Sequence, residues 1–275
     1  MKLELDYREH HSFNESYHWI LEKSGLFTIE KKETDEYNEL SRVGPEIFNK
    51  HKFGGVSFVR IDGKLIVIDT TFEVKKTKQL IDTGIFNKIK PDLCIKYEPN
   101  DEISNLVGCK VNNWVMFPAG SGLVSSFQWN GVCNRVGTLA SGKSSLKILG
   151  RAPWFDKARQ HSELFNVYVA CKQRTYCNSL RSSKFGVILS IRRDKNTREY
   201  EFISNFIPMA LNYKPVYPFA FEPGEHYYYM ETPDDLLKLS GVNAIPFHTR
   251  SVQLWENYFR PDKAVELLLS NFRQN

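Results

Sequence analysis

Cysteine is scarce in this chain of 275 residues and follows no spacing that carries chemistry. The five cysteines are odd in number and include no C-x-x-C pair. They therefore indicate neither a disulfide framework nor a structural zinc site. Reduced thiols are typical of a reducing compartment, so we expect a cytoplasmic protein, in the host cytoplasm if the chain is viral.

Long apolar runs and a cleavable leader are also missing. No apolar run reaches the roughly 18 residues that a membrane-spanning helix requires. The first residues, from Met1 to His11, become charged at once, which is unlike a secretory signal peptide. Internal repeats and low-complexity segments are absent as well. We therefore expect a globular protein with no membrane span.

The charge of the chain is moderate. Hydrophobic residues make up 41% and charged residues 25%, as in ordinary globular proteins. The net charge of +5 fits an anionic ligand or a nucleic-acid partner, and it fits a plain solvated surface equally well. The length allows one large domain or two of ordinary size.

The first part of the chain alternates between strand and helix patterns. Two β-rich runs, Val56–Ile61 and Lys64–Ile68, are joined by Asp62-Gly63, and this arrangement predicts a hairpin. The remaining patterns predict strands at 2–6, 91–97 and 111–117 and helices at 14–25 and 76–88.

A change in composition marks a domain boundary. The small, flexible run Pro118–Leu123 has the composition of a linker, and it predicts domains at 1–120 and 121–275. Strands that alternate with helices predict an α/β fold with parallel sheets in both halves. In the second half the patterns predict strands at 165–169, 185–190 and 215–217 and helices from 197 and at 261–272.

Residues 137–144 match G-x-x-x-x-G-K-[ST], the pattern of a phosphate-binding P-loop. A true P-loop would make the chain an NTPase or a kinase, with Lys143 on the outer phosphate. The setting is poor, because the preceding segment is polar and Gly150 and Pro153 interrupt the helix that should follow. We expect a glycine-rich turn that still touches a phosphate through Lys143 or Arg151, and the P-loop stays as an alternative.

A second alternative is a Mg²⁺-dependent nuclease. Asp62, Asp69 and the run Glu73-Val-Lys75 loosely match the carboxylates and lysine with which such enzymes hold the metal and orient a water. Here Glu73 and Lys75 follow the apolar run instead of lying inside it, which is also typical of a solvated strand end.

Histidine and aspartate side chains follow two predicted strands. His10 and His11 come after the strand at 2–6, and Asp69 ends the run 65–68. Ligands of α/β proteins bind at the carboxyl ends of the strands, so His11 and Asp69 are candidates for a catalytic base. Surface histidines and a structural cap are the plain alternatives.

The block from Ser183 to Leu236 holds the densest mixture of apolar, basic and acidic residues. Four cations lie between Arg192 and Arg198, directly after the strand predicted at 185–190. Guanidinium and ammonium groups at this density suit the neutralisation of a diphosphate. Asn196 or Thr197 would cap the next helix, whose first N–H groups would then face a phosphate.

Two glutamates follow in that helix. Glu199 and Glu201 lie two positions apart and cannot share a helical face, so we expect one to face the site and the other to face solvent. We assign Glu201 to the ribose, because two acceptor oxygens match the two hydroxyls of a vicinal diol. An ordinary helix with a charged face is the plain alternative.

Four segments of this block lie in the order apolar strand, acidic helix start, turn and short strand: Lys184–Ser190, Thr197–Glu201, Phe206–Pro208 and Pro215–Tyr217. In this order they resemble the C-terminal nucleotide-sugar site of GT-B glycosyltransferases. The segments Phe221–Tyr227 and Thr232–Leu236 resemble the loop and helix start that come next in that family. The chain is shorter than usual for the family and lacks its usual glycine-rich N-terminal loop.

The resemblance implies two Rossmann-like α/β domains facing a cleft, with the last helix able to cross back. The acceptor would bind the first domain near His11 and Asp69, the two candidate catalytic residues. The nucleotide-sugar donor would bind the second domain, with Glu201 on the ribose. The other donor-binding candidates are Lys143, Arg151, Lys184, Thr197 and Arg198.

The implied activity is transfer of a hexose or pentose from the nucleotide-sugar to an acceptor hydroxyl. It needs no bound metal ion or cofactor, and the lack of a D-x-D triplet agrees with this. The acceptor would be a glycan, a lipid-linked sugar or a hydroxymethylated base of phage DNA. A DNA acceptor would require a basic strip, for which the candidates are Lys50, Lys52, Arg60 and Lys64, or Lys75 and Lys76.

Overall fold

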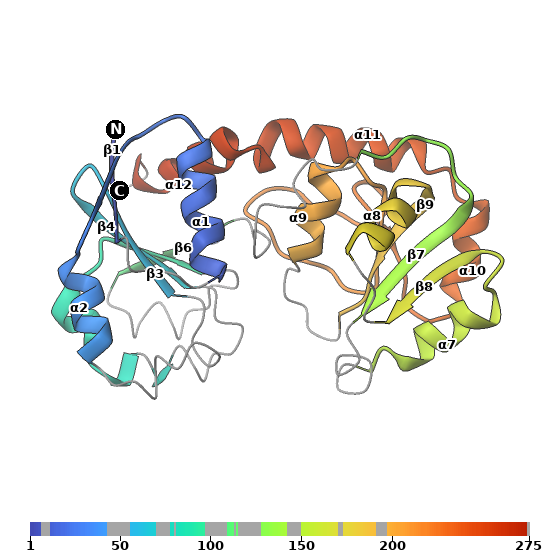
Figure 1. Ribbon diagram of the computed structural model, residues 1–275, viewed down its shortest axis with the longest axis horizontal. Coiled ribbons are helices and arrows are strands. Elements are labelled where there is room, and N and C mark those ends of the chain that lie inside the picture. Colours follow the sequence, from blue (N-terminus) through green and yellow to red (C-terminus); the bar gives the residue numbers. More distant parts are fainter. Residues whose placement is uncertain are drawn as a thin grey trace. The chain divides into compact units, whose positions relative to one another are not determined.

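The chain folds into two compact units, shown in the computed structural model of Figure 1. Unit 1 comprises Met1–Ser121 and Arg260–Asn275, and unit 2 comprises Gly122–Phe259. Each unit is built on one sheet with helices packed against it, so the expected α/β fold class is confirmed. The structure describes residues 1–6, 12–42, 56–69, 78–79, 81–96, 109–112, 114, 128–141, 150–169, 173–190 and 197–273.

Unit 1 contains a six-stranded sheet in the order β2-β1-β3-β4-β5-β6. Among the described strands only β3 runs antiparallel to its neighbours, as the predicted hairpin requires, and the other strand pairs are parallel. Asp62 and Gly63 both have positive φ, as a two-residue hairpin turn requires, and such a turn forces β3 and β4 to be antiparallel. The strands are β1 (Lys2–Asp6), β2 (Thr28–Lys32), β3 (Val56–Ile61), β4 (Lys64–Asp69), β5 (Leu93–Lys96) and β6 (Lys110–Asn112).

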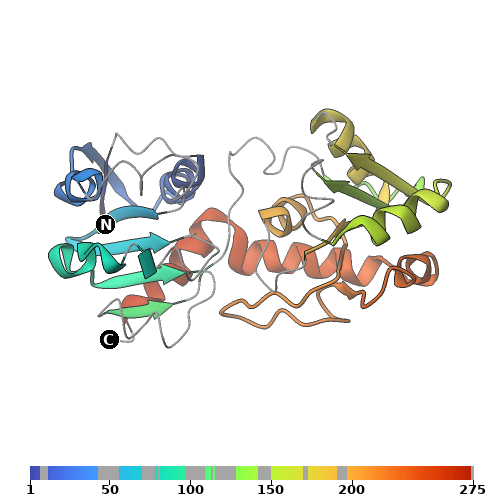
Figure 2. The same cartoon turned by 90° about the horizontal axis from the view of Figure 1, so that it is seen from below.

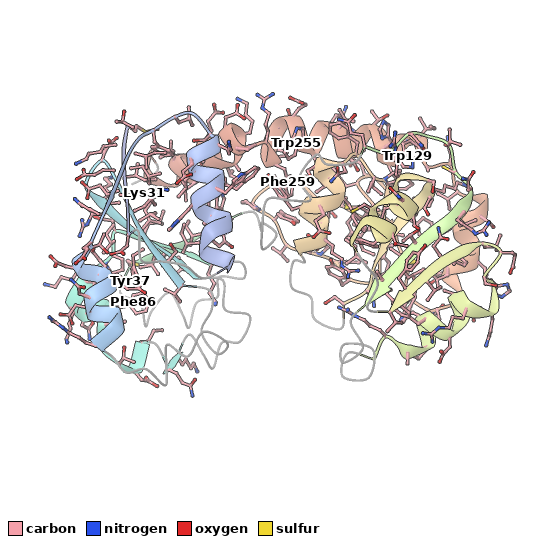
Figure 3. The ribbon with its side chains drawn as sticks, viewed as in Figure 1. Lys31, Tyr37, Phe86, Trp129, Trp255 and Phe259 are labelled. Atoms are coloured by element: carbon pink, nitrogen blue, oxygen red, sulfur yellow. The ribbon has the colours of Figure 1, made fainter. Side chains whose placement is uncertain are left out.

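Helices cover both faces of the unit 1 sheet. Helices α1 (Ser12–Lys23) and α12 (Pro261–Arg273) lie on one face, and α2 (Asp35–Arg42) and α4 (Ile85–Ile89) lie on the other (Figures 1 and 2). In Figure 3 the labelled Tyr37 of α2 and Phe86 of α4 lie next to each other. The Nε1 of Trp114 donates a hydrogen bond to the carbonyl of Ala264 at 2.8 Å, so the C-terminal helix α12 is anchored to unit 1.

Unit 2 contains a five-stranded sheet in the order β11-β10-β9-β7-β8, in which every described strand pair is parallel. The chain passes from β7 outward to β8 and then returns across β7 to β9. The strand order therefore reverses between β7 and β9, which makes this the switch point of the sheet. The strands are β7 (Arg135–Ser141), β8 (Phe165–Val169), β9 (Ser183–Ile188), β10 (Met209–Leu211) and β11 (Tyr228–Tyr229).

The helices of unit 2 also lie on two faces. The pairs α8 with α9 and α7 with α10 cover opposite faces of the sheet (Figure 1). Gly186 of β9 lies under the ring of Phe202 from α9, and a Cβ at this position would overlap that ring. The helices are α7 (Ala152–Gln160), α8 (Gln173–Arg181), α9 (Thr197–Ser204), α10 (Asp235–Lys238) and α11 (Ile245–Leu254), and α11 continues into a π-helical turn at Trp255–Phe259.

Three local expectations for unit 2 differ from the structure. The strand predicted at 215–217 is wrong: the strand of this region is β10, whose residues are fully buried, whereas Val216 is 58% exposed. Residues 137–141 belong to β7 and are not a loop. Pro153 does not interrupt a helix, because it lies in the first turn of α7, where proline is tolerated.

Two expectations for unit 1 lie partly outside the described residues. Of the helix predicted at 76–88, residues 78–79 and 81–82 are helical, residues 83–84 form a turn, and α4 begins at Ile85. Of the strand predicted at 111–117, it contains β6, which ends at Asn112. No described helix is both long enough and apolar enough to cross a membrane.

Candidate functional site

Arg198 connects two elements on either side of the switch point in unit 2. It lies in the first turn of α9, which follows β9. Its Nη1 donates a hydrogen bond to the carbonyl of Ala140 near the end of β7, at 2.6 Å. Its guanidinium also lies 5.3 Å from the centre of the Tyr176 ring. The guanidinium is thereby held at the carboxyl edge of the sheet, where ligands of α/β proteins bind.

Arg151 brings a second guanidinium to the same place. It lies directly before α7, which follows β7, and it is half-buried. Burial lowers its pKa, and the nearby charge of Arg198 lowers it further. An arginine stays charged at neutral pH despite such a shift. Two cations are therefore held close together at the switch point, and this arrangement favours an anion that carries more than one charge.

Glu199, the residue after Arg198, is fully enclosed. Its side chain is 0% exposed, and its two carboxylate oxygens accept hydrogen bonds from the hydroxyls of Tyr213 and Tyr217. The expectation that one of the two glutamates faces solvent is wrong, because both are buried. Helix α9 packs on the sheet, and its other side is covered by the π-helical turn, whose labelled Trp255 and Phe259 appear in Figure 3.

Glu201 is buried in a different way. It is 8% exposed, and burial raises the pKa of its carboxyl to about 7, against the opposing effect of Arg198. Residues three positions apart share a helical face, so Glu201 lies on the same face of α9 as Arg198. A carboxyl on this face, close to the charge of Arg198, can accept hydrogen bonds from ligand hydroxyls.

The structure separates Lys184 from the other donor-binding candidates. Lys184 lies at the start of β9, and its Nζ donates a hydrogen bond to the carbonyl of Ser240 at 2.8 Å. The start of β9 is at the amino edge of the sheet, opposite the edge with Arg151 and Arg198. Thr197 begins α9 at the carboxyl edge, with only its backbone described, and Lys143 lies outside the described residues.

In unit 1 the candidate Asp69 lies at the carboxyl end of β4, and the candidate His11 follows β1 in the sequence. The carboxyl ends of these two strands share one edge of the sheet, and only β3 lies between the two strands. Asp69 ends β4, with only its backbone described, and His11 lies outside the described residues. Asp6, at the end of β1, was not assigned a role from sequence. It is buried and accepts hydrogen bonds from the backbone N–H of Thr34 at 2.6 Å and from its hydroxyl at 2.9 Å, so it holds the start of α2.

The geometry of the described residues does not fit the two alternatives. A P-loop begins where its strand ends, but Gly137 to Ser141 are part of β7. For the nuclease, Asp62 lies in the hairpin turn at one end of β4 and Asp69 lies at the other end. Five residues of strand separate their backbones by about 17 Å, too far for one metal ion. Glu73 and Lys75 lie outside the described residues.

Sequence reasoning missed the part of the site that surrounds Glu199. Tyr217 was interpreted only as part of the strand predicted at 215–217, and Tyr213 and Tyr176 were not singled out. The available signal was Glu199, directly before the apolar residues of the helix, followed by the pattern Tyr213-x-x-x-Tyr217. In the part of the chain that the structure describes, no group of three or more His, Cys, Asp or Glu residues could hold a metal ion.

No protein-family model matches the chain, and no curated protein does either. Solved structures do resemble it. A TarM variant from S. aureus, solved with fondaparinux, alpha-GlcNAc-glycerol and UDP, has a TM-score of 0.48 at 12% identity over 73% of this chain and 48% of that chain. The pneumococcal O-GlcNAc transferase GtfA, solved with UDP and GlcNAc, has a TM-score of 0.42 at 13% identity over 71% of this chain and 47% of that chain.

The chain spans about half the length of these TarM and GtfA chains. MurG from Acinetobacter baumannii matches over nearly its whole length, with a TM-score of 0.39 at 11% identity over 97% of this chain and 98% of that chain. Every one of these TM-scores is below 0.5, so these similarities do not indicate a substrate or a mechanism.

Proposed function

We propose that the chain is a GT-B-type glycosyltransferase that moves a sugar from a nucleotide-sugar donor to an acceptor hydroxyl. The observation that carries the proposal is the pair of guanidinium groups, Arg151 and Arg198, at the switch point of a parallel sheet. Open α/β sheets bind nucleotides at this point, and two adjacent arginines match the charge of a diphosphate.

The donor site is assigned to unit 2. Arg151 and Arg198 bind the diphosphate. Helix α7, which follows Arg151, and helix α9, whose first turn contains Arg198, point their first N–H groups toward the same edge of the sheet. Glu201 accepts hydrogen bonds from the ribose hydroxyls. Lys143 and Thr197 are kept as donor-binding residues, because one follows β7 and the other begins α9. Lys184 is left out.

The proposed reaction forms a bond between the acceptor oxygen and C1 of the sugar and breaks the bond between C1 and the diphosphate oxygen. The acceptor proton goes to a base in unit 1, for which His11 and Asp69 are the candidates. Negative charge grows on the diphosphate as its bond to C1 breaks. Cations that are already in place stabilise this charge without any rearrangement, so the proposed catalysis is mainly electrostatic.

Among the acceptors, a glycan is favoured over DNA. The hypothesis of a DNA acceptor depends on a strip of basic side chains that includes Arg60. In the structure Arg60 is engaged by Glu36, to which its Nε donates at 3.1 Å, and by the carbonyl of Gly63, to which its Nη1 donates at 2.8 Å. A guanidinium held in this way is less available to a phosphate backbone.

The proposal is tested by thermal unfolding with a panel of UDP-, GDP-, TDP- and CMP-sugars in the presence of EDTA. At least one donor should raise the Tm, because a ligand that binds the folded state stabilises it. Arg151→Ala and Arg198→Ala should abolish the increase. Lys184→Ala is the matched control and should keep it. No stabilisation by any donor, or full stabilisation of Arg198→Ala, would contradict the proposal.

A further inference from the structure

A short segment that follows β10 is tied to the carboxyl edge of the unit 2 sheet at several points. The Oδ1 of Asn212 accepts a hydrogen bond from the backbone N–H of Ser190, just beyond β9, at 2.7 Å. The hydroxyls of Tyr213 and Tyr217 donate to the two carboxylate oxygens of Glu199. We call Glu199, Tyr213 and Tyr217 the tyrosine clamp. It joins this segment to the first turn of α9.

The carboxylate of the tyrosine clamp has no access to a ligand. Glu199 is fully buried, and each of its oxygens already accepts a hydrogen bond. Burial of a charge is costly unless donors surround it, and here two hydroxyls and the first turn of a helix offset that cost. A group enclosed in this way acts through the residues that it holds in place.

The tyrosine clamp holds the turn of α9 that carries Arg198. Arg198 is the residue before Glu199, so the position of the first turn of α9 sets the position of its guanidinium. Tyr213 lies close enough to Arg151 to interact with its charge. Burial lowers the pKa of Arg151, and the nearby charge of Arg198 lowers it further. Two like charges close to each other are costly without an anion, so a fixed turn of α9 favours the arrangement that an anion needs.

We propose that Glu199 is a positioning residue for the diphosphate: through Tyr213 and Tyr217 it holds the first turn of α9, and with it Arg198, in place to bind a diphosphate together with Arg151. This inference rests on the proposed function and deepens it. It predicts that the tyrosine clamp determines affinity for the diphosphate part of the donor and leaves affinity for the nucleoside part unchanged, because pre-arranged donors lower the cost of binding.

The test uses Tyr213→Phe and Tyr217→Phe in the full chain. Each change removes one O–H donor and keeps the ring and the charge of Glu199. Titration calorimetry with inorganic pyrophosphate should show about tenfold weaker binding for each variant, the size expected from loss of one hydrogen bond to a charged group. Affinity for the nucleoside of the best donor should stay at the wild-type value. If the clamp had a merely structural role, the substitutions would weaken the binding of pyrophosphate and of the nucleoside together.

Tyr227→Phe is the matched control. Tyr227 is also buried in unit 2, but its hydroxyl makes no hydrogen bond within the described part of the chain, so this variant should bind pyrophosphate like wild type. The inference is overturned if both clamp variants bind pyrophosphate like wild type, if their affinity for the nucleoside falls by the same factor as their affinity for pyrophosphate, or if neither variant folds. Failure of wild type to bind any nucleotide or pyrophosphate would instead overturn the proposed function.

Discussion

Glu201 is the residue at which stability and the proposed function conflict. Its carboxyl is nine-tenths buried, and burial raises its pKa from 4.5 to about 7. In the folded state it therefore keeps a proton that the unfolded chain has already released between these two values. Stability consequently falls as the pH rises through this window. A buried carboxyl that lowers the stability of the folded protein in this way is a candidate functional group.

We predict that Glu201→Gln stabilises the protein at high pH. The variant removes the ionisation, so it should gain about 3 kcal/mol over wild type near pH 8 and almost nothing near pH 4.5. Urea unfolding at the two pH values measures the difference. Affinity for the donor nucleotide should fall in the same variant, because an amide is a poorer acceptor for the ribose hydroxyls. An equal stability change at both pH values would show that folding does not raise the pKa of this carboxyl.

At the scale of elements, the contact between β9 and α9 positions the donor site. Gly186 has no side chain, so the ring of Phe202 packs directly on the strand. This close approach sets the height of α9 above the sheet, and with it the reach of Arg198 to β7. This contact depends on one residue of β9 and one residue of α9. The hydrophobic pattern of neither segment predicts it.

We predict that Gly186→Ala destabilises unit 2 by about 1–3 kcal/mol, because the added methyl group overlaps the ring and must push the helix or the ring aside. Denaturant unfolding monitored by circular dichroism measures this change. Gly241→Ala serves as the control, since a Cβ at that position would meet nothing within 4 Å. Equal effects of the two substitutions would show that the strand and the helix are not packed as described.

At the scale of the whole molecule, the chain enters unit 2 near Gly122 and returns to unit 1 at Arg260. The return helix α12 contributes Ala264, Val265 and Leu268 to the buried residues, and Trp114 hydrogen-bonds to its backbone. The core of unit 1 is therefore completed by residues from the end of the chain.

We predict that Leu268→Ala destabilises unit 1 by about 2–5 kcal/mol, because it leaves a cavity beneath α12. Hydrogen exchange of the native protein should show the loss of protection in β1 to β6 and α1, and not in β7 to β11. The reciprocal variant, Leu236→Ala in unit 2, should give the opposite pattern. Loss of protection throughout the chain in both variants would show that the two units unfold as one.

Much of the local structure could be predicted from sequence. The hairpin at Asp62-Gly63, the helix that begins at Thr197 and the terminal helix at Pro261 all follow from signals within a few residues. The errors share a cause. The strand expected at 215–217 and the glycine-rich turn expected within 137–144 were inferred from local composition, whereas burial in the sheet decides which segments become strands.

Local sequence signals are enough to predict the α/β class, the turn that makes β3 antiparallel, and the chemistry of the block around Thr197, because backbone preferences and side-chain types are local properties. Which of those side chains meet depends on the tertiary fold. Arg198 reaches a carbonyl 58 residues away, Glu199 is enclosed by two tyrosines, and Lys184 lies at the opposite edge of the sheet. These placements depend on the order of parallel strands, which no local pattern encodes.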